Sequence, residues 1–189
     1  MIKKALILLT LTLCMGTAVF SQPMSSGYVG MSPWAHLIGK QFIDVTQPDM
    51  KGKKHKLSEY CGRGKYVLVD FWASWCGPCM REMPNVKACW EKYRKKGFTV
   101  VGISLDRNAA AWKDAVSKGG YAWTHLSDLK HFENSAAQAY NVQYIPWNML
   151  VDPKGKIVAI ELTGANLENT LKKYLAPKAA AAKKKTVRK

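Results

Sequence analysis

Two cysteines separated by two residues, Cys76 and Cys79, are the residues of this chain best suited to chemistry. They follow an apolar run, residues 66–72, and precede a segment with helical spacing. A buried strand that leads into Cys-x-x-Cys at the start of a helix is typical of a dithiol that cycles between reduced and disulfide forms. The free N–H groups at a helix start favour an anion, so we expect Cys76 to be the exposed attacking thiolate. We expect Cys79, one turn further along, to be more buried and to resolve the mixed disulfide.

Asp70 is the second candidate for chemistry, because it stands inside the apolar run before the cysteines. A carboxylate in a strand covered on both faces cannot point to water, and burial raises its pKa toward neutrality. Asp70 is then able to hold a proton close to the dithiol. Pairing of Asp70 with a lysine, such as Lys113, is the alternative. Glu82, one turn after Cys79, is expected to be a solvated helix residue.

The segments around these residues alternate between strand and helix patterns. Residues 41–45 and 53–57 read as a hairpin around turn residues. The further expected elements are a strand over 66–72, a helix over 78–96 that stops at Gly97, a strand over 98–105, a helix from the cap Asn108 to residue 118, a short strand over 123–126, a short helix over 135–140, strands over 147–151 and 157–162, and a last helix capped by Asn166. This order predicts an α/β fold with a mixed sheet and helices on both sides.

The first 21 residues have a pattern of their own. Two lysines are followed by a short apolar stretch and by a small-residue cleavage site after Ser21, which predicts a signal peptide. The apolar stretch is too short for an ordinary membrane-spanning helix, which needs about 20 apolar residues. A membrane anchor and a lipoprotein start at Cys14 are the alternatives. We therefore expect a periplasmic or otherwise extracytoplasmic protein.

The rest of the chain divides into a flexible leader over residues 22–36, one domain over residues 37–176 and a disordered basic tail over residues 177–189. The formal net charge of +16 is concentrated at the ends, since residues 178–189 carry six Lys or Arg and no acid. The tail reads either as a solvated end or as a weak contact with acidic surfaces. No interleaving of aromatic and basic residues favours a nucleic-acid partner.

At this point the chain resembles the thioredoxin superfamily and, within it, the exported thiol-disulfide oxidoreductases of the TlpA/ResA type. The resemblance covers roughly residues 37–175. It is carried by residues 41–43, by the segment 71–79 with Glu82 and Pro84, and by residues 101–106, 144–146 and 150–157. It implies a thioredoxin-like fold, in which a central mixed sheet flanked by helices is joined by an N-terminal β-hairpin and a helical insertion.

The resemblance also implies an activity, namely extracytoplasmic exchange of thiols and disulfides without a cofactor. The Gly77-Pro78 pair resembles that of reductants, so we expect a reductase of protein disulfides, such as those of cytochrome c precursors, that is recharged by a membrane electron donor. In the family, the carboxylate at the position of Asp70 takes the proton of the buried second cysteine.

The same resemblance implies the substrate-binding residues. A cis-proline, here Pro146 after Ile145, lies beside the dithiol and offers backbone pairing to the substrate chain. Gly77 and Pro78 border the site between the cysteines. Trp75 and Trp147 are expected to form an apolar platform, with ordinary core packing as the alternative.

Two further cysteines, Cys61 and Cys89, belong to no motif. Cys61 precedes the central strand and Cys89 lies well along the following helix, so both could lie at the end of the sheet away from the dithiol. A structural disulfide between them is one interpretation in an oxidising compartment, and two unpaired buried thiols are the other.

Other kinds of site do not fit the pattern. The four histidines show no ligand spacing, so we expect no metal. Haem attachment needs a histidine where Met80 stands, and a peroxidase of the related kind needs a threonine where Ala73 stands. The rival hypothesis is a thioredoxin-fold binding or holdase module whose dithiol does not turn over.

Overall fold

The computed structural model describes residues 32–176. The predicted signal peptide with Cys14, most of the predicted leader and the predicted basic tail lie outside these residues. Within them, no helix is both long and apolar enough to cross a membrane.

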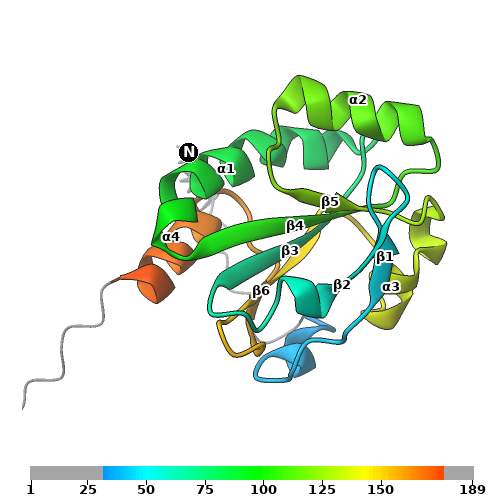
Figure 1. Ribbon diagram of the computed structural model, residues 1–189. Helices are drawn as coiled ribbons and strands as arrows, with labels where there is room; N and C mark the ends of the chain where they lie inside the picture. The colour runs from blue at the N-terminus through cyan, green and yellow to red at the C-terminus, as the bar shows by residue number, and fades with distance from the viewer. Residues whose placement is uncertain (1–31, 177–189) are drawn as a thin grey trace, which may run out of the picture.

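The described chain alternates strands and helices, as the sequence predicts (Figure 1). The strands are β1 (Thr46–Pro48), β2 (Lys54–Lys56), β3 (Tyr66–Trp72), β4 (Phe98–Ser104), β5 (Thr124–Leu126), β6 (Trp147–Val151) and β7 (Ile157–Ile160). The helices are α1 (Gly77–Tyr93), α2 (Ala109–Gly119), α3 (Ser135–Ala139) and α4 (Gly164–Leu175), with short 3₁₀ turns η1 (Ala35–Leu37), η2 (Leu57–Glu59), η3 (Arg94–Lys96) and η4 (His131–Glu133).

Five strands form one mixed sheet in the order β5-β4-β3-β6-β7. The central strand β3 pairs parallel with β4 and antiparallel with β6, and β1 and β2 form a separate hairpin. β3 is buried along six of its seven residues, which is the burial its near-continuous apolar run predicts. The predicted fold class is confirmed, including the N-terminal hairpin and the helical insertion, which is α2 with β5.

Helices cover both faces of this sheet (Figure 1). α1 and α2 lie side by side on one face, where Lys87 Nζ of α1 donates to the Gly119 carbonyl at the end of α2 (2.9 Å), and α4 packs against α1. Phe71 of β3 packs against Tyr140, which follows α3, on the opposite face. Successive strand residues point to opposite faces, so Asp70 and Trp72 face the side that α1 and α2 cover.

The main helix α1 begins and ends where the sequence indicates. Cys76 is its N-cap, and the 3₁₀ turn η3 carries it to Gly97, whose φ of 88° is left-handed and suits glycine. The Asn108 cap of α2 is also confirmed, since its side chain accepts from the backbone N–H groups of Ala110 and Ala111. The predicted Asn166 cap is wrong, because α4 begins at Gly164 after Thr163.

The hairpin begins later than the sequence predicts. The segment 41–45 is not a strand, since its start is bound elsewhere. Phe42 N–H donates to the Gly155 carbonyl and Gly39 N–H donates to the Ile157 carbonyl, so this segment lies along the β6–β7 turn and the start of β7. The pairing with β2 starts only at Thr46.

The leader boundary at residue 36 is also wrong. Trp34 is buried, its indole Nε1–H donates to the Tyr140 carbonyl (2.9 Å), and its ring packs on Trp147. A large aromatic ring buried in this way stabilises the fold, so the domain includes residues 32–36 as well.

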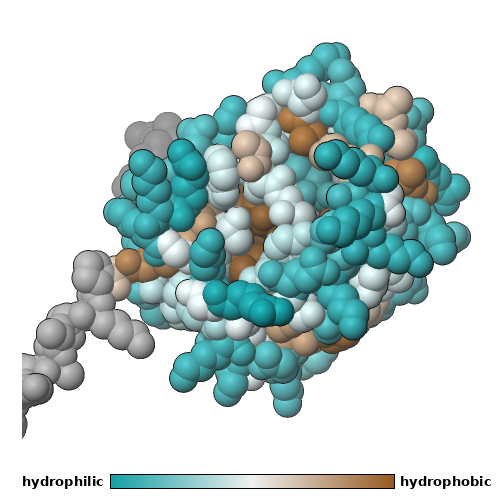
Figure 2. Space-filling model, in the orientation of Figure 1, coloured by the Kyte–Doolittle hydropathy of each residue, from teal (hydrophilic) through white to brown (hydrophobic). Residues whose placement is uncertain are grey.

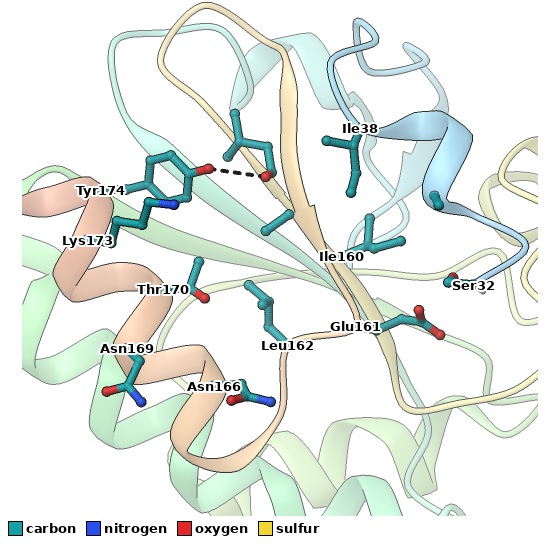
Figure 3. Close-up of a pocket in the computed structure, with 13 residues that line it drawn as sticks. Ser32, Ile38, Ile160, Glu161, Leu162, Asn166, Asn169, Thr170, Lys173 and Tyr174 are labelled. Atoms are coloured by element: carbon teal, nitrogen blue, oxygen red, sulfur yellow. Dashed lines mark hydrogen bonds between the residues drawn. The ribbon is translucent and has the colours of Figure 1, made fainter. Parts of the chain in front are cut away.

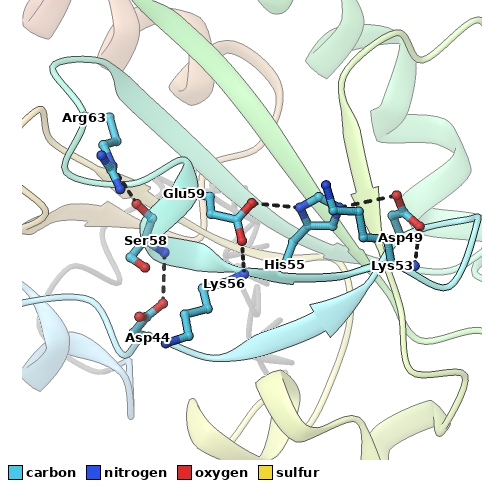
Figure 4. A network of polar contacts seen from close by, with 8 residues as sticks. All are labelled: Asp44, Asp49, Lys53, His55, Lys56, Ser58, Glu59 and Arg63. Carbon is cyan, nitrogen blue, oxygen red and sulfur yellow. Dashed lines mark hydrogen bonds and ion pairs between the residues drawn. The ribbon is translucent and has the colours of Figure 1, made fainter.

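The hairpin is joined to η2 by a network around His55 (Figure 4). One ring nitrogen lies 2.8 Å from Glu59 Oε2 and the other lies 3.3 Å from Asp49 Oδ2. The hydrogen bond with Glu59 raises the pKa of His55, and Asp49 adds to this effect. The surface around these elements is largely hydrophilic, with small apolar areas between the polar side chains (Figure 2).

Candidate active site

Cys76 and Cys79 form a disulfide at the start of α1. Cys76 is the helix N-cap, and its Sγ lies 3.1 Å from the backbone nitrogen of Cys79, whose N–H points at the sulfur. Pro78 occupies the first turn, where its missing N–H costs no helix hydrogen bond. A thiolate on Cys76 would therefore lie at the positive end of the helix and accept a backbone hydrogen bond.

The two sulfurs differ in their surroundings more than in their burial. Cys76 is 5% exposed and Cys79 is 2% exposed. Cys76, however, stands between the exposed residues Trp75 and Gly77, with Pro78 exposed beyond, whereas Cys79 points into the core. A partner disulfide can therefore approach Cys76 from the surface that these neighbours form.

Asp70 is buried in the sheet, at 4% exposure, on the face that carries α1. Burial raises its pKa to about 7, a hydrogen bond with Asn148 opposes this rise, and the charge of Glu82 adds to it. Lys113 is not a partner, because it lies on an exposed part of α2 near the hairpin. The carboxyl group can therefore bind or release a proton near neutral pH.

Asp70 belongs to a row of buried polar residues that crosses four strands. The register aligns it with Asn148 of β6 on one side and with Gly102 of β4 on the other, and Gly102 is aligned with His125 of β5. A Cβ at Gly102 would lie 2.8 Å from His125 Nδ1, so only glycine leaves room for the imidazole. Burial lowers the pKa of His125 to about 4, which keeps this ring neutral beside the row.

The Ile145-Pro146 peptide bond is cis, as the resemblance implies. The Ile145 carbonyl oxygen lies 3.8 Å from Cys76 Sγ, so the loop before β6 reaches the dithiol. Both residues are half-buried. The structure thus brings the cysteines and the cis-proline loop together, although they are distant in the sequence.

Trp147 does not form a platform for a substrate. It is fully buried and packs against Phe71 and Tyr140, since it is the first residue of β6 and points into the core. The prediction for Trp147 is therefore wrong. Trp75 is 50% exposed and stacks on His131 with ring centroids 4.8 Å apart.

Cys61 and Cys89 are free and buried, so the disulfide interpretation is wrong for the described structure. They lie on opposite faces of the sheet. Cys61 lies near Tyr140 and Asp44, whereas Cys89 of α1 lies near Glu168 of α4. Burial is the main cause that raises the pKa of Cys61 to about 12 and that of Cys89 to about 11.

Asp106 is a site residue that the sequence reasoning missed as a functional candidate. Its buried carboxylate accepts from the backbone N–H of Ser74 (3.0 Å), from the Ser74 hydroxyl (2.6 Å) and from the Ser104 hydroxyl (2.7 Å). These bonds fix the turn that leads to Trp75 and Cys76. An acidic residue directly after a buried strand was the available signal, because strand ends carry functional side chains in such sheets.

The largest groove of the described residues lies elsewhere. It has a volume of about 620 Å³, and β7, η1 and α4 line it (Figure 3). No residue of the Cys76–Cys79 motif lines it, so we do not assign it to the dithiol chemistry. No group of three or more His, Cys, Asp or Glu side chains in the described chain could hold a metal ion.

Comparison with protein families gives one match by family model, the AhpC/TSA family, over residues 38–160. Among curated proteins, the thiol-disulfide oxidoreductase ResA of Bacillus thuringiensis subsp. konkukian is 30% identical over 138 residues, which are 73% of this chain and 76% of that protein. ResA of Geobacillus kaustophilus is 29% identical over a stretch of the same length.

Solved structures show the same similarity. The thioredoxin domain of a thiol-disulfide oxidoreductase from Bacteroides vulgatus is 36% identical with a TM-score of 0.67, and the match covers 73% of this chain and 97% of that one. A thiol:disulfide interchange protein from Bacteroides sp. is 33% identical with a TM-score of 0.68, over 77% and 95% of the two chains.

Proposed function

Because this chain belongs to the AhpC/TSA family and is a thioredoxin-like thiol-disulfide oxidoreductase, we propose that it reduces disulfides of exported proteins through Cys76 and Cys79. The observation that carries the proposal is the position of Cys76 as the N-cap of α1, beside a partner sulfur with which it bonds. The extracytoplasmic location rests on the sequence of residues 1–21 alone.

The proposed reaction has two exchange steps. The Cys76 thiolate attacks one sulfur of the substrate disulfide, so that a mixed disulfide forms and the other substrate sulfur leaves as a thiolate. The Cys79 thiol then loses its proton and attacks Cys76 Sγ, which breaks the mixed disulfide and releases the second substrate thiolate. The substrate gains two electrons, and Cys76 and Cys79 end as the disulfide seen in the structure.

Asp70 is the proposed acceptor of the Cys79 proton. It faces α1 from the sheet below, and burial raises its pKa to about 7. A carboxyl group with this pKa is partly ionised at neutral pH, so it can take a proton and later release it. The Ile145-Pro146 loop is proposed to pair with the substrate backbone, since its carbonyl group lies beside Cys76.

Reduction of insulin disulfides by the dithiol tests the activity. We expect the wild type to accelerate insulin reduction by dithiothreitol and Cys76→Ser to lose this acceleration. Cys61→Ser is the matched control, because it also removes a buried thiol but lies outside the motif. Equal turnover by the wild type and Cys76→Ser would contradict the proposal and favour a peptide-binding module without redox turnover.

The direction of the reaction is tested by the reduction potential of the dithiol in a glutathione or dithiothreitol buffer. A reductase is expected near the thioredoxin value of about −270 mV, whereas a strong oxidant lies near about −120 mV. A value close to the second figure would contradict the assignment as a reductase. Re-reduction requires a donor dithiol, which we propose is held at the membrane.

A further inference from the structure

Two aromatic side chains stand out on the surface around the dithiol. Trp75 is 50% exposed and Tyr144 is 49% exposed, and they belong to the few large apolar side chains that the described surface exposes to this extent. Trp75 directly precedes Cys76, and Tyr144 directly precedes Ile145, whose carbonyl oxygen lies 3.8 Å from Cys76 Sγ. Both aromatic residues are thus one residue away from the same contact.

Each of the two rings is held by partners. The Trp75 indole stacks on the His131 imidazole at an interplanar angle of 20° and meets Phe132 edge-on. The Tyr144 hydroxyl donates to a Glu161 carboxylate oxygen, and its ring meets Trp34 edge-on at 5.1 Å. Glu161 follows the end of β7 (Figure 3). The two rings therefore have fixed orientations although each is half-exposed.

The segment that holds Trp75 is itself firmly anchored. His131 has a left-handed φ of 56°, and such a backbone persists only where the surroundings hold it. Asn134 provides the anchor, because it is fully buried and exchanges hydrogen bonds with Gln47 and Asp128. The partner of Trp75 is thus part of the fixed scaffold.

A partner of Cys76 has to cover this surface. Cys76 is only 5% exposed, so a disulfide that reaches its sulfur brings its own chain against the residues beside it. Aromatic rings held in place bind apolar groups at a low cost in conformational entropy. The exposed, fixed rings on the two sides of the contact therefore favour a chain that has apolar bulk close to its disulfide.

We propose that Trp75 and Tyr144 form a two-sided docking surface for an extended polypeptide that carries a bulky apolar side chain next to its half-cystine. His131 and Glu161 are positioning residues, which act through the rings that they hold. This inference rests on the proposed function, and it names the substrate class as unfolded or extended protein segments, in preference to small disulfides such as oxidised glutathione.

The experiment compares three disulfides as substrates of the reduced protein. Two are peptides of equal length and charge, one with Phe and the other with Ser next to the cysteine, and the third is oxidised glutathione. Quenched samples are separated by chromatography to give kcat/KM for each. We expect a preference of at least tenfold for the Phe peptide over the Ser peptide, since burial of one aromatic side chain changes binding by about this factor or more.

The variants then assign the preference to the rings. Trp75→Ala and Tyr144→Ala are each expected to reduce the ratio of the two peptide rates at least threefold. His131→Ala and Glu161→Ala are expected to do the same, whereas His131→Phe and Glu161→Gln, which keep a stacking ring and a hydrogen-bond acceptor, restore the wild-type ratio. Ile43→Ala is the matched control, because it removes an exposed apolar side chain away from the contact with Cys76.

The outcomes separate this inference from the proposed function. Reduction of all three disulfides with equal kcat/KM, or an unchanged peptide ratio in both aromatic variants, would overturn the docking surface and leave the oxidoreductase proposal intact. Failure of the wild type to reduce any of them would overturn both. A concentration-dependent dimer that Trp75→Ala abolishes would assign the surface to a second copy of the chain and would also overturn the inference.

Discussion

Replacement of Asp70 by Asn is expected to make the oxidised protein more stable at alkaline pH and slower in exchange. The substitution keeps the size of the side chain and its position opposite Asn148, but it removes the buried group that titrates. A carboxylate that is costly to bury destabilises the fold whenever it is ionised. Asp70 is therefore a position where stability is expected to be lower than an uncharged residue would allow.

The sign and size of the effect follow from the pKa values. The pKa of Asp70 is raised from 3.8 to about 7 in the folded protein, so the folded state binds more protons than the unfolded state between these pH values. The free energy of unfolding therefore falls as the pH rises through this window. At about 1.4 kcal/mol per pH unit, the loss between pH 4.5 and pH 8.5 is at most about 3 kcal/mol.

Urea unfolding of the oxidised proteins at several pH values measures this loss. Other groups titrate as well, so the quantity to compare is the stability difference between Asp70→Asn and the wild type, in which their contributions cancel. This difference should grow in favour of the variant between pH 4.5 and pH 8.5. Asp114→Asn, which removes an exposed carboxylate of α2 paired with Lys118, is the control and should show little pH dependence.

A second readout links the stability effect to the reaction. In Asp70→Asn the mixed disulfide at Cys76 should persist longer, because Cys79 loses its proton acceptor. A stability difference that stays constant across the pH range, or a variant that is less stable at pH 8.5 than the wild type, would refute the assignment of a raised pKa to Asp70.

Three further predictions concern the residues around the dithiol. Trp147→Ala should destabilise the protein by about 3–5 kcal/mol in urea unfolding because the ring is fully buried, whereas Trp75→Ala should cost about 1 kcal/mol or less; similar losses for both would contradict their different burial. Cys61 and Cys89 should resist iodoacetamide at pH 8 in the folded protein, since burial raises the pKa of each thiol, and rapid labelling of either by peptide mass spectrometry would be inconsistent with the structure. Asp106→Asn should lower the free energy of unfolding by about 1–3 kcal/mol, because the charged acceptor of three hydrogen bonds is lost, and unchanged stability would exclude its anchoring role.

Local patterns predict the dithiol and the sheet well. The Cys76–Cys79 spacing, the apolar run of β3 and the Asn108 cap are each local signals, and the structure agrees with all three. Asp70 was found because a lone carboxylate in a buried run has few explanations.

The errors arise where distant segments compete for the same partner. Residues 41–45 have a strand pattern, yet their backbone groups pair with the turn before β7, which no local pattern reveals. Trp147 carries a large ring next to Pro146, and only the tertiary packing on Phe71 and Tyr140 shows that it points inward. Cys61 and Cys89 could be paired on paper because the sequence does not say on which face of the sheet each lies.

The pH dependence of iodoacetamide labelling at Cys76 in the reduced protein tests the central claim most directly. If the start of α1 stabilises the Cys76 thiolate, its labelling rate should reach half its maximum below pH 8, and Cys79 should react much more slowly. A midpoint at or above about 8.5, where an ordinary exposed thiol ionises, would contradict the account.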